Sequence, residues 1–260
     1  MTVLVDPPRW PAHGRLWSHV ASDSSLAELH AFAARTGIPQ RSFEGDHYDI
    51  PQERYAEVVA AGAAEVSGTE LARRLRDSGL RFRKRKGERP LARVDDGLAG
   101  IAPTPHVLEV VASPLERLGA GASVVLVRAS EAPGRMVLVR NSTREGWGAP
   151  GGKREPSDAS ARATAVREVA EEVGLELAPR DLEPVGYERI TLPTGNGARS
   201  WEEGDNYVQT YAVTLPSAVP LRPDGVEVVE ARWLTIDEAR GLAGSAAWWP
   251  LADWWWALGR

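Results

Sequence analysis

The chain has 260 residues and a formal net charge of −5 at pH 7, with 43% hydrophobic and 26% charged residues. These values are typical of a soluble globular protein with room for one large domain or two ordinary ones, and they exclude a fibrous or disordered chain. The mildly acidic balance argues against nucleic acid as a partner. The absence of cysteine excludes disulfides, thiolate zinc sites and cysteine nucleophiles.

The amino-terminal segment and the apolar runs bear on where the protein works. Residues 1–6 contain no basic stretch followed by a long apolar run, so we expect no signal peptide. No apolar stretch reaches the roughly 18–20 residues needed to span a bilayer, so we expect no membrane partner. Lysine occurs only at Lys84, Lys86 and Lys153, whereas arginine and alanine are abundant, which favours a GC-rich bacterial coding sequence. We therefore expect a cytoplasmic bacterial protein.

The first 80 residues show alternating strand and helix patterns. Strands are expected from short runs at residues 3–5, 41–43 and 64–66. Ser25 with Glu28, and Ser67 with Glu70, form capping boxes at the starts of two helices. Pro51 suits the first turn of a helix between them. The resulting βαβαβα order predicts a small α/β domain with a parallel sheet and right-handed crossovers.

Histidine and aspartate gather in the first 50 residues. Asp6 and then His13 follow the first expected strand, and Asp46 and His47 follow the second. Because ligands bind beyond the carboxyl ends of the strands in an open parallel sheet, Asp6, His13, Asp46 and His47 are candidates for a metal or phosphate site. The alternative is ordinary hydrogen bonding and capping within the loops. His30 lies in an amphipathic helical pattern and is expected to pack there.

Residues 81–120 are expected to form a connector between two domains. A basic run covers residues 81–89, and prolines and glycines punctuate the remainder. The simpler interpretation of the basic run is a solvated linker or a flap that packs on acidic neighbours. The alternative is a phosphate-binding patch.

The second half of the chain has the pattern of another α/β domain. Strands are expected at residues 123–127, 136–139, 185–191, 207–214 and 229–234. A turn containing Pro133 and Gly134 joins the first two strands into a hairpin. A helix is expected over residues 157–173, and Thr235 with Glu238 caps another helix.

Three carboxylates crowd the helix expected over residues 157–173. Its apolar residues form one stripe at about 3.6 residues per turn, and Glu168, Glu171 and Glu172 are expected on the opposite face. Like-charge repulsion and the helix dipole near the terminating Gly174 both disfavour this arrangement. A divalent cation would relieve both, and clustered oxygen ligands suit Mg²⁺ or Mn²⁺. An isolated acidic helix face is usually only solvated, so these three residues do not decide the matter alone.

The loop before this helix completes a longer motif. Residues 147–153, Trp-Gly-Ala-Pro-Gly-Gly-Lys, contain glycines whose backbone can approach a ligand closely. Together with residues 167–175, Arg-Glu-Val-Ala-Glu-Glu-Val-Gly-Leu, this loop resembles the Nudix box, in which a glycine is followed by spaced Glu, Arg-Glu, Glu-Glu and Gly. The resemblance covers about residues 121–243. It implies an α/β/α sandwich with a mixed sheet.

Two features depart from the family pattern. Asp158 stands where the box has its first Glu, and the spacing from Gly152 to Arg167 is one residue longer. An insertion inside the helix would rotate the acidic face by about 100°. Because residues 167–175 are internally intact, we place the insertion before Ala163, in the loop or at the start of the helix. The role of Asp158 is then open, whereas the three glutamates keep theirs.

The resemblance implies a metal-dependent hydrolase that cleaves the pyrophosphate bond of a nucleoside diphosphate derivative. Glu168, Glu171 and Glu172 would bind Mg²⁺ or Mn²⁺ together with the carbonyl of Gly151, and Arg167 would orient Glu168. The metal would neutralise the diphosphate and orient the attacking water. The general base is either a box glutamate or one of four downstream acids: Glu202, Glu203, Asp205 and Glu227.

Substrate contacts are expected from the loops around the box. Trp147 either stacks on a base or fills the core, and Gly152 lets a substrate approach the backbone. The loop carrying Glu202, Glu203 and Asp205 is either a substrate loop or an ordinary acidic turn.

The family implies a small nucleotide substrate, drawn from nucleoside triphosphates, ADP-ribose, dinucleoside polyphosphates and related compounds. Pro193 lies near the place where a proline accompanies ADP-ribose preference, so we favour ADP-ribose or another nucleotide sugar over a triphosphate. The alternative is a Nudix-like sensor that binds nucleotide without cutting it and regulates a phosphoesterase or binding function of the N-terminal domain. A phosphoesterase working in series with the Nudix domain is a further possibility.

The N-terminal segment resembles a small bacterial domain family of unknown function. The resemblance rests on residues 5–10, 14–19 and 45–49, and it supplies no activity. We therefore expect a small α/β domain over residues 1–80, the connector over 81–120 and a Nudix domain over 121–260.

Tryptophan concentrates at the carboxyl end of the chain. Half of the ten tryptophans lie in the final 13 residues. Each buries a large apolar area, so we expect this tail to dock on the Nudix or the N-terminal domain. The alternative is a homodimer interface. The tail has no basic face that would favour a membrane surface.

Overall fold

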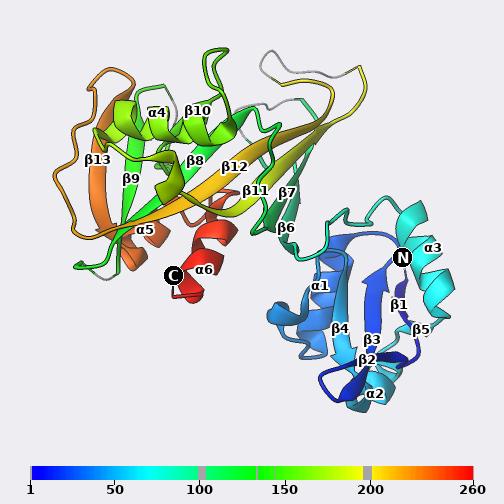
Figure 1. The fold of residues 1–260 in the computed structure, drawn as a ribbon. Helices are drawn as coiled ribbons and strands as arrows, with labels where there is room; N and C mark the ends of the chain where they lie inside the picture. Colours follow the sequence, from blue (N-terminus) through cyan, green and yellow to red (C-terminus); the bar gives the residue numbers. More distant parts are fainter. Residues whose placement is uncertain (1, 99–103, 133, 144, 196–200, 260) are drawn as a thin grey trace. The chain divides into compact units, whose positions relative to one another are not determined.

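The computed structural model describes residues 2–98, 104–132, 134–143, 145–195 and 201–259 (Figure 1). The chain divides into two compact units, Met1–Leu91 and Ala92–Arg260. This boundary falls inside the segment that the sequence predicts to be a connector. Within the described ranges, no helix is both long enough and apolar enough to cross a membrane.

The first unit is built on a five-stranded, mainly antiparallel sheet in which β2, β3, β1 and β5 are neighbours in that order and β4 also pairs with β3. The strands are β1 (Val3–Val5), β2 (Trp10–Ala12), β3 (Arg15–Ser22), β4 (His47–Pro51) and β5 (Ala64–Glu65). Strand β3 runs antiparallel to β1, β2 and β4, and β1 runs parallel to β5. The α/β class is confirmed, but the parallel βαβαβα sheet predicted for residues 1–80 is wrong.

The strand missing from the prediction, β3, explains this difference. His13 and Gly14, with φ angles of 51° and 74°, form a two-residue turn that joins β2 to β3. Such a turn makes a hairpin, so the two strands must be antiparallel. The strand expected at residues 41–43 is also misplaced, because Gln40–Ser42 is a 3₁₀ turn and β4 begins five residues later.

The helices of the first unit cover both faces of its sheet. They are α1 (Leu26–Arg35), α2 (Tyr55–Ala60) and α3 (Gly68–Asp77). Ser25 and Ser67 accept the predicted capping hydrogen bonds from the backbone N–H groups of Glu28 and Glu70, which confirms two of the predicted helix starts. Helices α1 and α2 pack on the face that carries Val20, whereas α3 packs on the face that carries Ala21.

The basic run packs on acidic side chains of its own unit. The Lys84 ammonium lies 2.8 Å from a carboxylate oxygen of Glu44, and a guanidinium nitrogen of Arg81 lies 3.6 Å from Asp46. These contacts support the simpler interpretation of residues 81–89 as a flap on acidic neighbours.

The second unit is built on an eight-stranded mixed sheet, with the order β13-β9-β8-β12-β11-β7-β6 and with β10 paired to β8. Its strands are β6 (Arg89–Asp95), β7 (Val107–Ala112), β8 (Ala122–Ala129), β9 (Arg135–Asn141), β10 (Gly151–Lys153), β11 (Glu183–Leu192), β12 (Gly204–Leu215) and β13 (Val228–Thr235). Strands β8 and β12 are parallel, whereas β8 with β9, β9 with β13, and β7 and β12 with β11 are antiparallel. Because β6 and β7 belong to this sheet, residues 81–120 are not a linker throughout.

Helices cover both faces of this sheet, with α4 (Ala161–Val173) on one side and α5 (Ile236–Ala243) and α6 (Trp249–Ala257) on the other (Figure 1). Val125 and Val127 of β8 pack on the α4 side, and Leu126 between them packs on the α5 and α6 side. This alternation follows from the two-residue period of a strand. The predicted α/β/α sandwich with a mixed sheet is confirmed.

The tryptophan-rich tail folds into the second unit. Trp249 and Trp255 of α6 are 3% and 2% exposed and pack in one core cluster with Leu126 and Met136. The predicted docking of the tail is therefore confirmed, and burial within the unit explains these two tryptophans without a dimer interface.

Glu188 of β11 is a carboxyl group buried in this sheet. It is 6% exposed, with Val110 and Val208 opposite it on the neighbouring strands, and burial raises its pKa to about 7. Because its pKa is higher in the folded than in the unfolded chain, the folded state holds the proton more tightly. Its contribution to stability is therefore complete below the unfolded pKa and is lost as pH rises through about 7.

We predict that Glu188→Gln will remove this pH dependence. Relative to wild type, the free energy of unfolding of the variant should rise by roughly 2–3 kcal/mol between pH 4.5 and pH 8. Urea unfolding at several pH values measures this difference. A difference in the free energy of unfolding between the two proteins that stays constant from pH 4.5 to pH 8 would contradict the raised pKa of Glu188.

Candidate active site

The glycine loop is held against the sheet by β10. Gly151 and Gly152 pair with Val124 and Ser123 of β8. Gly151 has a φ of 150°, and a Cβ at this position would lie 2.2 Å from the carbonyl oxygen of Ser123. A Cβ on Gly152 would lie 2.4 Å from Oε1 of Glu168. Position 151 therefore requires glycine, whereas a side chain at position 152 would have to displace the Glu168 carboxylate.

Helix α4 presents two of its glutamates to this loop. Glu168 and Glu172 are 9% and 6% exposed, and Oε2 of Glu172 accepts a 2.7 Å hydrogen bond from the Gly151 N–H. The Glu171 side chain is 59% exposed. Consecutive side chains leave a helix about 100° apart, so Glu171 and Glu172 point in different directions. The expectation that all three glutamates lie opposite the buried stripe is therefore corrected, because two of them are buried.

The environment of Glu168 disfavours its negative charge. Burial raises the pKa of Glu168, while Arg167, whose Nη2 lies 3.0 Å from Oε1 of Glu168, acts in the opposite direction. The charges of Glu171 and Glu227 raise this pKa further. A buried carboxylate with acidic neighbours and close glycine backbone is a donor set that fits a hard divalent cation.

Arg167 is fixed by Asp158, the residue whose role the sequence left open. Its Nε and Nη2 donate to the two carboxylate oxygens of Asp158 at 3.2 and 3.0 Å, and Nη2 also donates to the Lys153 carbonyl at 3.0 Å. The hydrogen bond from Arg167 lowers the pKa of Asp158 to about 2. Arg167 also donates to Glu171 at 2.7 Å. Asp158 thus orients the arginine beside the glutamates.

The start of α4 agrees with an insertion ahead of Ala163. The helix begins at Ala161, four residues later than expected, and the Ser160 hydroxyl accepts from the Ala163 N–H at 3.1 Å. Asp158 lies in the preceding turn, where its carboxylate accepts from the Glu155 N–H at 2.9 Å. Asp158 therefore lies outside the helix, and Arg167, Glu168, Glu171 and Glu172 share one uninterrupted helix.

Of the four downstream acids, three lie in the hairpin formed by β11 and β12, and the fourth, Glu227, affects a glutamate of the box. Glu203 accepts from the Gly195 N–H at 2.9 Å, and Asp205 accepts from the Thr191 hydroxyl at 2.8 Å. Glu202 is exposed, as are Glu203 and Asp205. These bonds within one hairpin support the interpretation of an ordinary acidic turn. Glu227, by contrast, acts electrostatically on Glu168.

Trp147 lies against the core of the second unit. It is half-buried against the core cluster between the sheet, α5 and α6. The Arg232 guanidinium carbon lies 5.4 Å from the centroid of its ring. Of the two interpretations from the sequence, these contacts favour the core.

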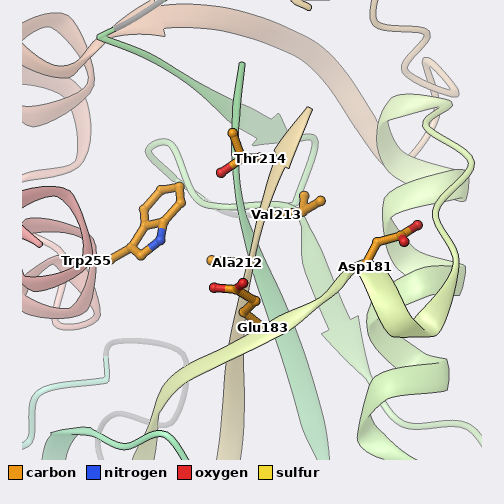
Figure 2. A pocket seen from close by; sticks show the side chains of 6 residues that line it. All are labelled: Asp181, Glu183, Ala212, Val213, Thr214 and Trp255. Carbon is orange, nitrogen blue, oxygen red and sulfur yellow. The ribbon is translucent and has the colours of Figure 1, made fainter. Parts of the chain in front are cut away.

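A separate pocket of about 400 Å³ opens beside the start of β11 and the last residues of β12 (Figure 2). It is lined by Asp181, Glu183, Ala212, Val213, Thr214 and Trp255. None of the box residues lines it, so we assign it no part in the candidate active site.

In the first unit, three of the four candidate site residues come together. Asp6, Asp46 and His47 lie in one region with His19 and Asp49, which the sequence reasoning missed. His13 is exposed in the turn before β3 and does not belong to this cluster, so its prediction as a site residue is wrong. His19 was missed because its strand was missed. His30 packs as expected, with Nδ1 2.8 Å from the Tyr48 hydroxyl, and burial lowers its pKa.

The charges of this cluster are tightly paired. Burial acts to lower the pKa of His47, but its pairing with Asp46 and Asp49 outweighs burial and raises the pKa to about 9. Among the described residues, His19, His47 and Asp49 are the one group of three His, Asp or Glu side chains whose potential ligand atoms all lie within 4.8 Å of one another. The box glutamates are more widely spaced, with Arg167 among them.

Comparison with known proteins decides the family. Residues 117–252, just over half of the chain, match the family model described as NUDIX domain. The chain belongs to the Nudix family. Its second unit is accordingly that of a Nudix-type pyrophosphohydrolase, as the box predicts. Residues 3–78 of this Nudix protein match a model described as a protein of unknown function (DUF4031), which confirms the second resemblance.

Solved structures resemble the Nudix half of the chain at low identity. The NUDIX domain of Shewanella oneidensis NrtR complexed with ADP ribose is 17% identical, with a TM-score of 0.38 over 49% of this chain and 79% of that one. A C. elegans Ap4A hydrolase is 17% identical, with a TM-score of 0.40 over 53% and 96%. The E. coli dihydroneopterin triphosphate pyrophosphohydrolase is 17% identical, with a TM-score of 0.40 over 51% and 92%. A search of curated proteins found no match.

We predict that Asp158→Asn will destabilise the Nudix unit more than Glu171→Gln. The first change removes a buried charge partner of Arg167 and should lower the free energy of unfolding by about 1–3 kcal/mol. The second change affects an exposed ion pair and should cost less than about 1 kcal/mol. Denaturant unfolding followed by tryptophan fluorescence measures both. Equal losses of unfolding free energy in the two variants would show that Asp158 does not hold Arg167 in place.

Proposed function

We propose that the Nudix unit hydrolyses the pyrophosphate bond of a nucleoside diphosphate derivative, with ADP-ribose or another nucleotide sugar as the favoured substrate and a nucleoside triphosphate next. The observation that carries this proposal is the pair of buried glutamates, Glu168 and Glu172, held against the Gly151-Gly152 backbone. Burial of two carboxylates is unfavourable unless a positive charge compensates it. Arg167 lies beside Glu168, while the charges of Glu171 and Glu227 add to the negative potential at that carboxylate, which favours a divalent cation there.

Mg²⁺ or Mn²⁺ is the cofactor that this site supports best. Glu168, Glu171 and Glu172 would hold the ion, with the carbonyl of Gly151 as a further ligand. When bound, such an ion neutralises diphosphate oxygens and lowers the pKa of the attacking water. The protein's own contribution is positional, because the Gly151 N–H fixes Glu172 and Asp158 fixes Arg167 beside Glu168.

The substrate preference rests on Pro193. This residue is exposed directly after Leu192, the last residue of β11. Its position supports a nucleotide sugar through the family resemblance. A panel of ADP-ribose, a dinucleoside polyphosphate and a nucleoside triphosphate, assayed with Mg²⁺, tests the preference, and faster turnover of the triphosphate would reverse it.

We predict that Glu172→Gln will lower turnover of the best substrate at least about 100-fold, because it removes a proposed metal ligand. Glu176→Gln is the matched control, since Glu176 is exposed one turn beyond Glu172 and outside the helix. Steady-state hydrolysis with Mg²⁺ measures both. Undiminished turnover in Glu172→Gln would remove the metal assignment. Nucleotide binding by the wild type without turnover of any substrate would favour the sensor.

Among the downstream acids, we favour Glu227 as the general base, because its charge acts on the proposed site. Glu227→Gln should lower kcat by about 100-fold or more, as expected on removing a general base. Glu202→Gln, in the exposed hairpin, should leave kcat within a few-fold of wild type. If both variants keep full activity, the base is a box glutamate instead.

A further inference from the structure

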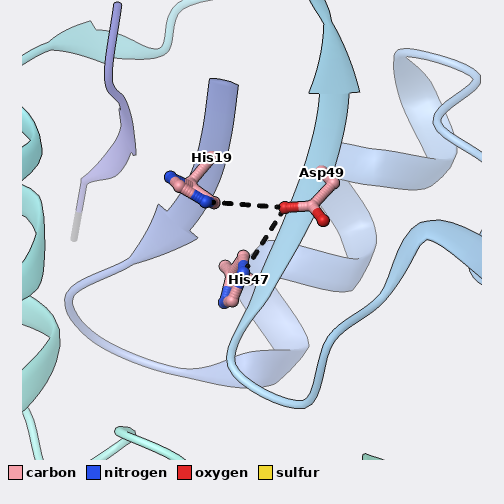
Figure 3. Close-up of side chains that lie close together, drawn as sticks. All are labelled: His19, His47 and Asp49. Carbon is pink, nitrogen blue, oxygen red and sulfur yellow. Dashed lines mark ion pairs between the residues drawn. The ribbon is translucent and has the colours of Figure 1, made fainter. Parts of the chain in front are cut away.

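The first unit gathers two histidines and an aspartate on one face of its sheet (Figure 3). His19 of β3 lies directly opposite Asp49 of β4 in the antiparallel register. His47 precedes Asp49 by two residues on the same strand, so both side chains leave the same face. This is the face on which α3 packs. The pairing of two strands therefore brings the three side chains together.

The atoms that face one another are potential metal ligands. Oδ1 of Asp49 lies 3.4 Å from Nε2 of His47 and 3.8 Å from Nε2 of His19. Both distances exceed the range of a charge-assisted hydrogen bond, about 2.7–2.9 Å. They are close to the spacing of about 3.4 Å between two atoms that share one tetrahedral ion at 2.0–2.1 Å.

Oδ1 of Asp49 is buried and has no hydrogen-bond partner among the described residues. A buried carboxylate oxygen without a hydrogen bond is costly, because it has lost its contacts with water and the ion pair with His47 at 3.4 Å replaces them only in part. A cation between Asp49 and the two imidazoles would compensate it.

Two further carboxylates orient the histidines. Nδ1 of His19 lies 3.0 Å from Oδ2 of Asp6, and Nδ1 of His47 is paired with Oδ1 of Asp46. Asp6 and Asp46 are 1% and 2% exposed, and each also accepts a 2.6 Å backbone N–H bond, from His19 and Phe82 respectively. Carboxylates placed behind imidazoles in this way hold the rings so that Nε2 is presented to a metal.

The cluster adjoins a pocket of about 750 Å³ that both histidines line. Arginine dominates its charged lining, through Arg9, Arg76 and Arg81. Ser67 and Gly68, at the N-terminus of the ten-residue helix α3, line it as well. Guanidinium groups and a helix N-terminus both favour anions, and phosphate in particular.

We propose that His19, His47 and Asp49 bind one divalent transition-metal ion, and that the arginine-lined pocket beside it receives a phosphate-bearing small molecule. Imidazole nitrogens favour Zn²⁺ or a similar ion, in contrast to the oxygen donors of the Nudix box. Three protein ligands leave a coordination position open, as in zinc sites that bind a further ligand. The proposal concerns the first unit alone, so it stands or falls independently of the proposed hydrolysis.

The full-length protein, freed of metal by a chelator and kept in excess Mg²⁺, can be titrated with Zn²⁺ at pH 7.5 and measured by calorimetry and X-ray absorption. We expect one tightly bound equivalent whose spectrum shows two imidazole ligands. His19→Gln and His47→Gln should each weaken binding at least about 100-fold, and Asp6→Asn, which removes a positioning residue, by about 10- to 100-fold. His13→Gln, in the exposed turn, is the matched control and should bind as the wild type does.

Asp49→Asn provides a second variant should the histidine variants fail to fold, because the Asp49 side chain is 38% exposed. Its circular dichroism should match that of the wild type while Zn²⁺ binding is lost. Zn²⁺ affinity unchanged in Asp49→Asn and in folded histidine variants would overturn the metal site. So would a proton resonance spectrum in which both imidazoles stay protonated in excess Zn²⁺.

Inorganic phosphate tests the pocket. It should bind the Zn²⁺-loaded protein at least about tenfold more tightly than the metal-free protein, because the two ligands would share one site. Arg76→Gln should weaken phosphate binding several-fold. Arg73→Gln, on the same helix but paired with Glu70 and Asp77, should not. Phosphate affinity that is indifferent to both Zn²⁺ and Arg76 would overturn this part of the proposal.

Discussion

The close approach of two glycines to two buried glutamates is the constraint on which the candidate active site depends. The backbone of Gly152 lies close to the Glu168 carboxylate, and Gly151 donates its N–H to Glu172. Carboxylates removed from water in this way require compensation. The sheet supplies the rigidity, since β10 fixes the glycines against β8 while α4 packs on the same face. The negative charges of the buried glutamates favour a bound cation.

Three carboxylates of this site surround Arg167. It contacts Asp158, Glu168 and Glu171, each at 3.2 Å or less. Asp158 accepts two of these hydrogen bonds, one on each carboxylate oxygen. It reaches the arginine from the turn just before the helix.

The two units present different donor chemistry. The Nudix unit offers carboxylate oxygens and backbone, which suit Mg²⁺, whereas the first unit offers imidazole nitrogens backed by buried carboxylates. In both, the proposed metal ligands stand on regular elements rather than on long loops: α4 and β10 in one, β3 and β4 in the other. Such elements hold ligand atoms in fixed positions, which a binding site requires.

The sequence alone determined the features that depend on near neighbours in the chain. The box glutamates, the caps at Ser25 and Ser67, and five of the eight strands of the Nudix sheet could be predicted, because helical spacing, capping and apolar runs are local patterns. Tertiary structure decided the rest. The turn at His13 and Gly14 set the direction of β3, and only strand pairing brought His19 opposite Asp49. Likewise, β6 and β7 pair into the sheet beside β11, which lies far from them in the sequence. Strand pairing links residues far apart in the chain, and no local pattern specifies the register of such a pairing.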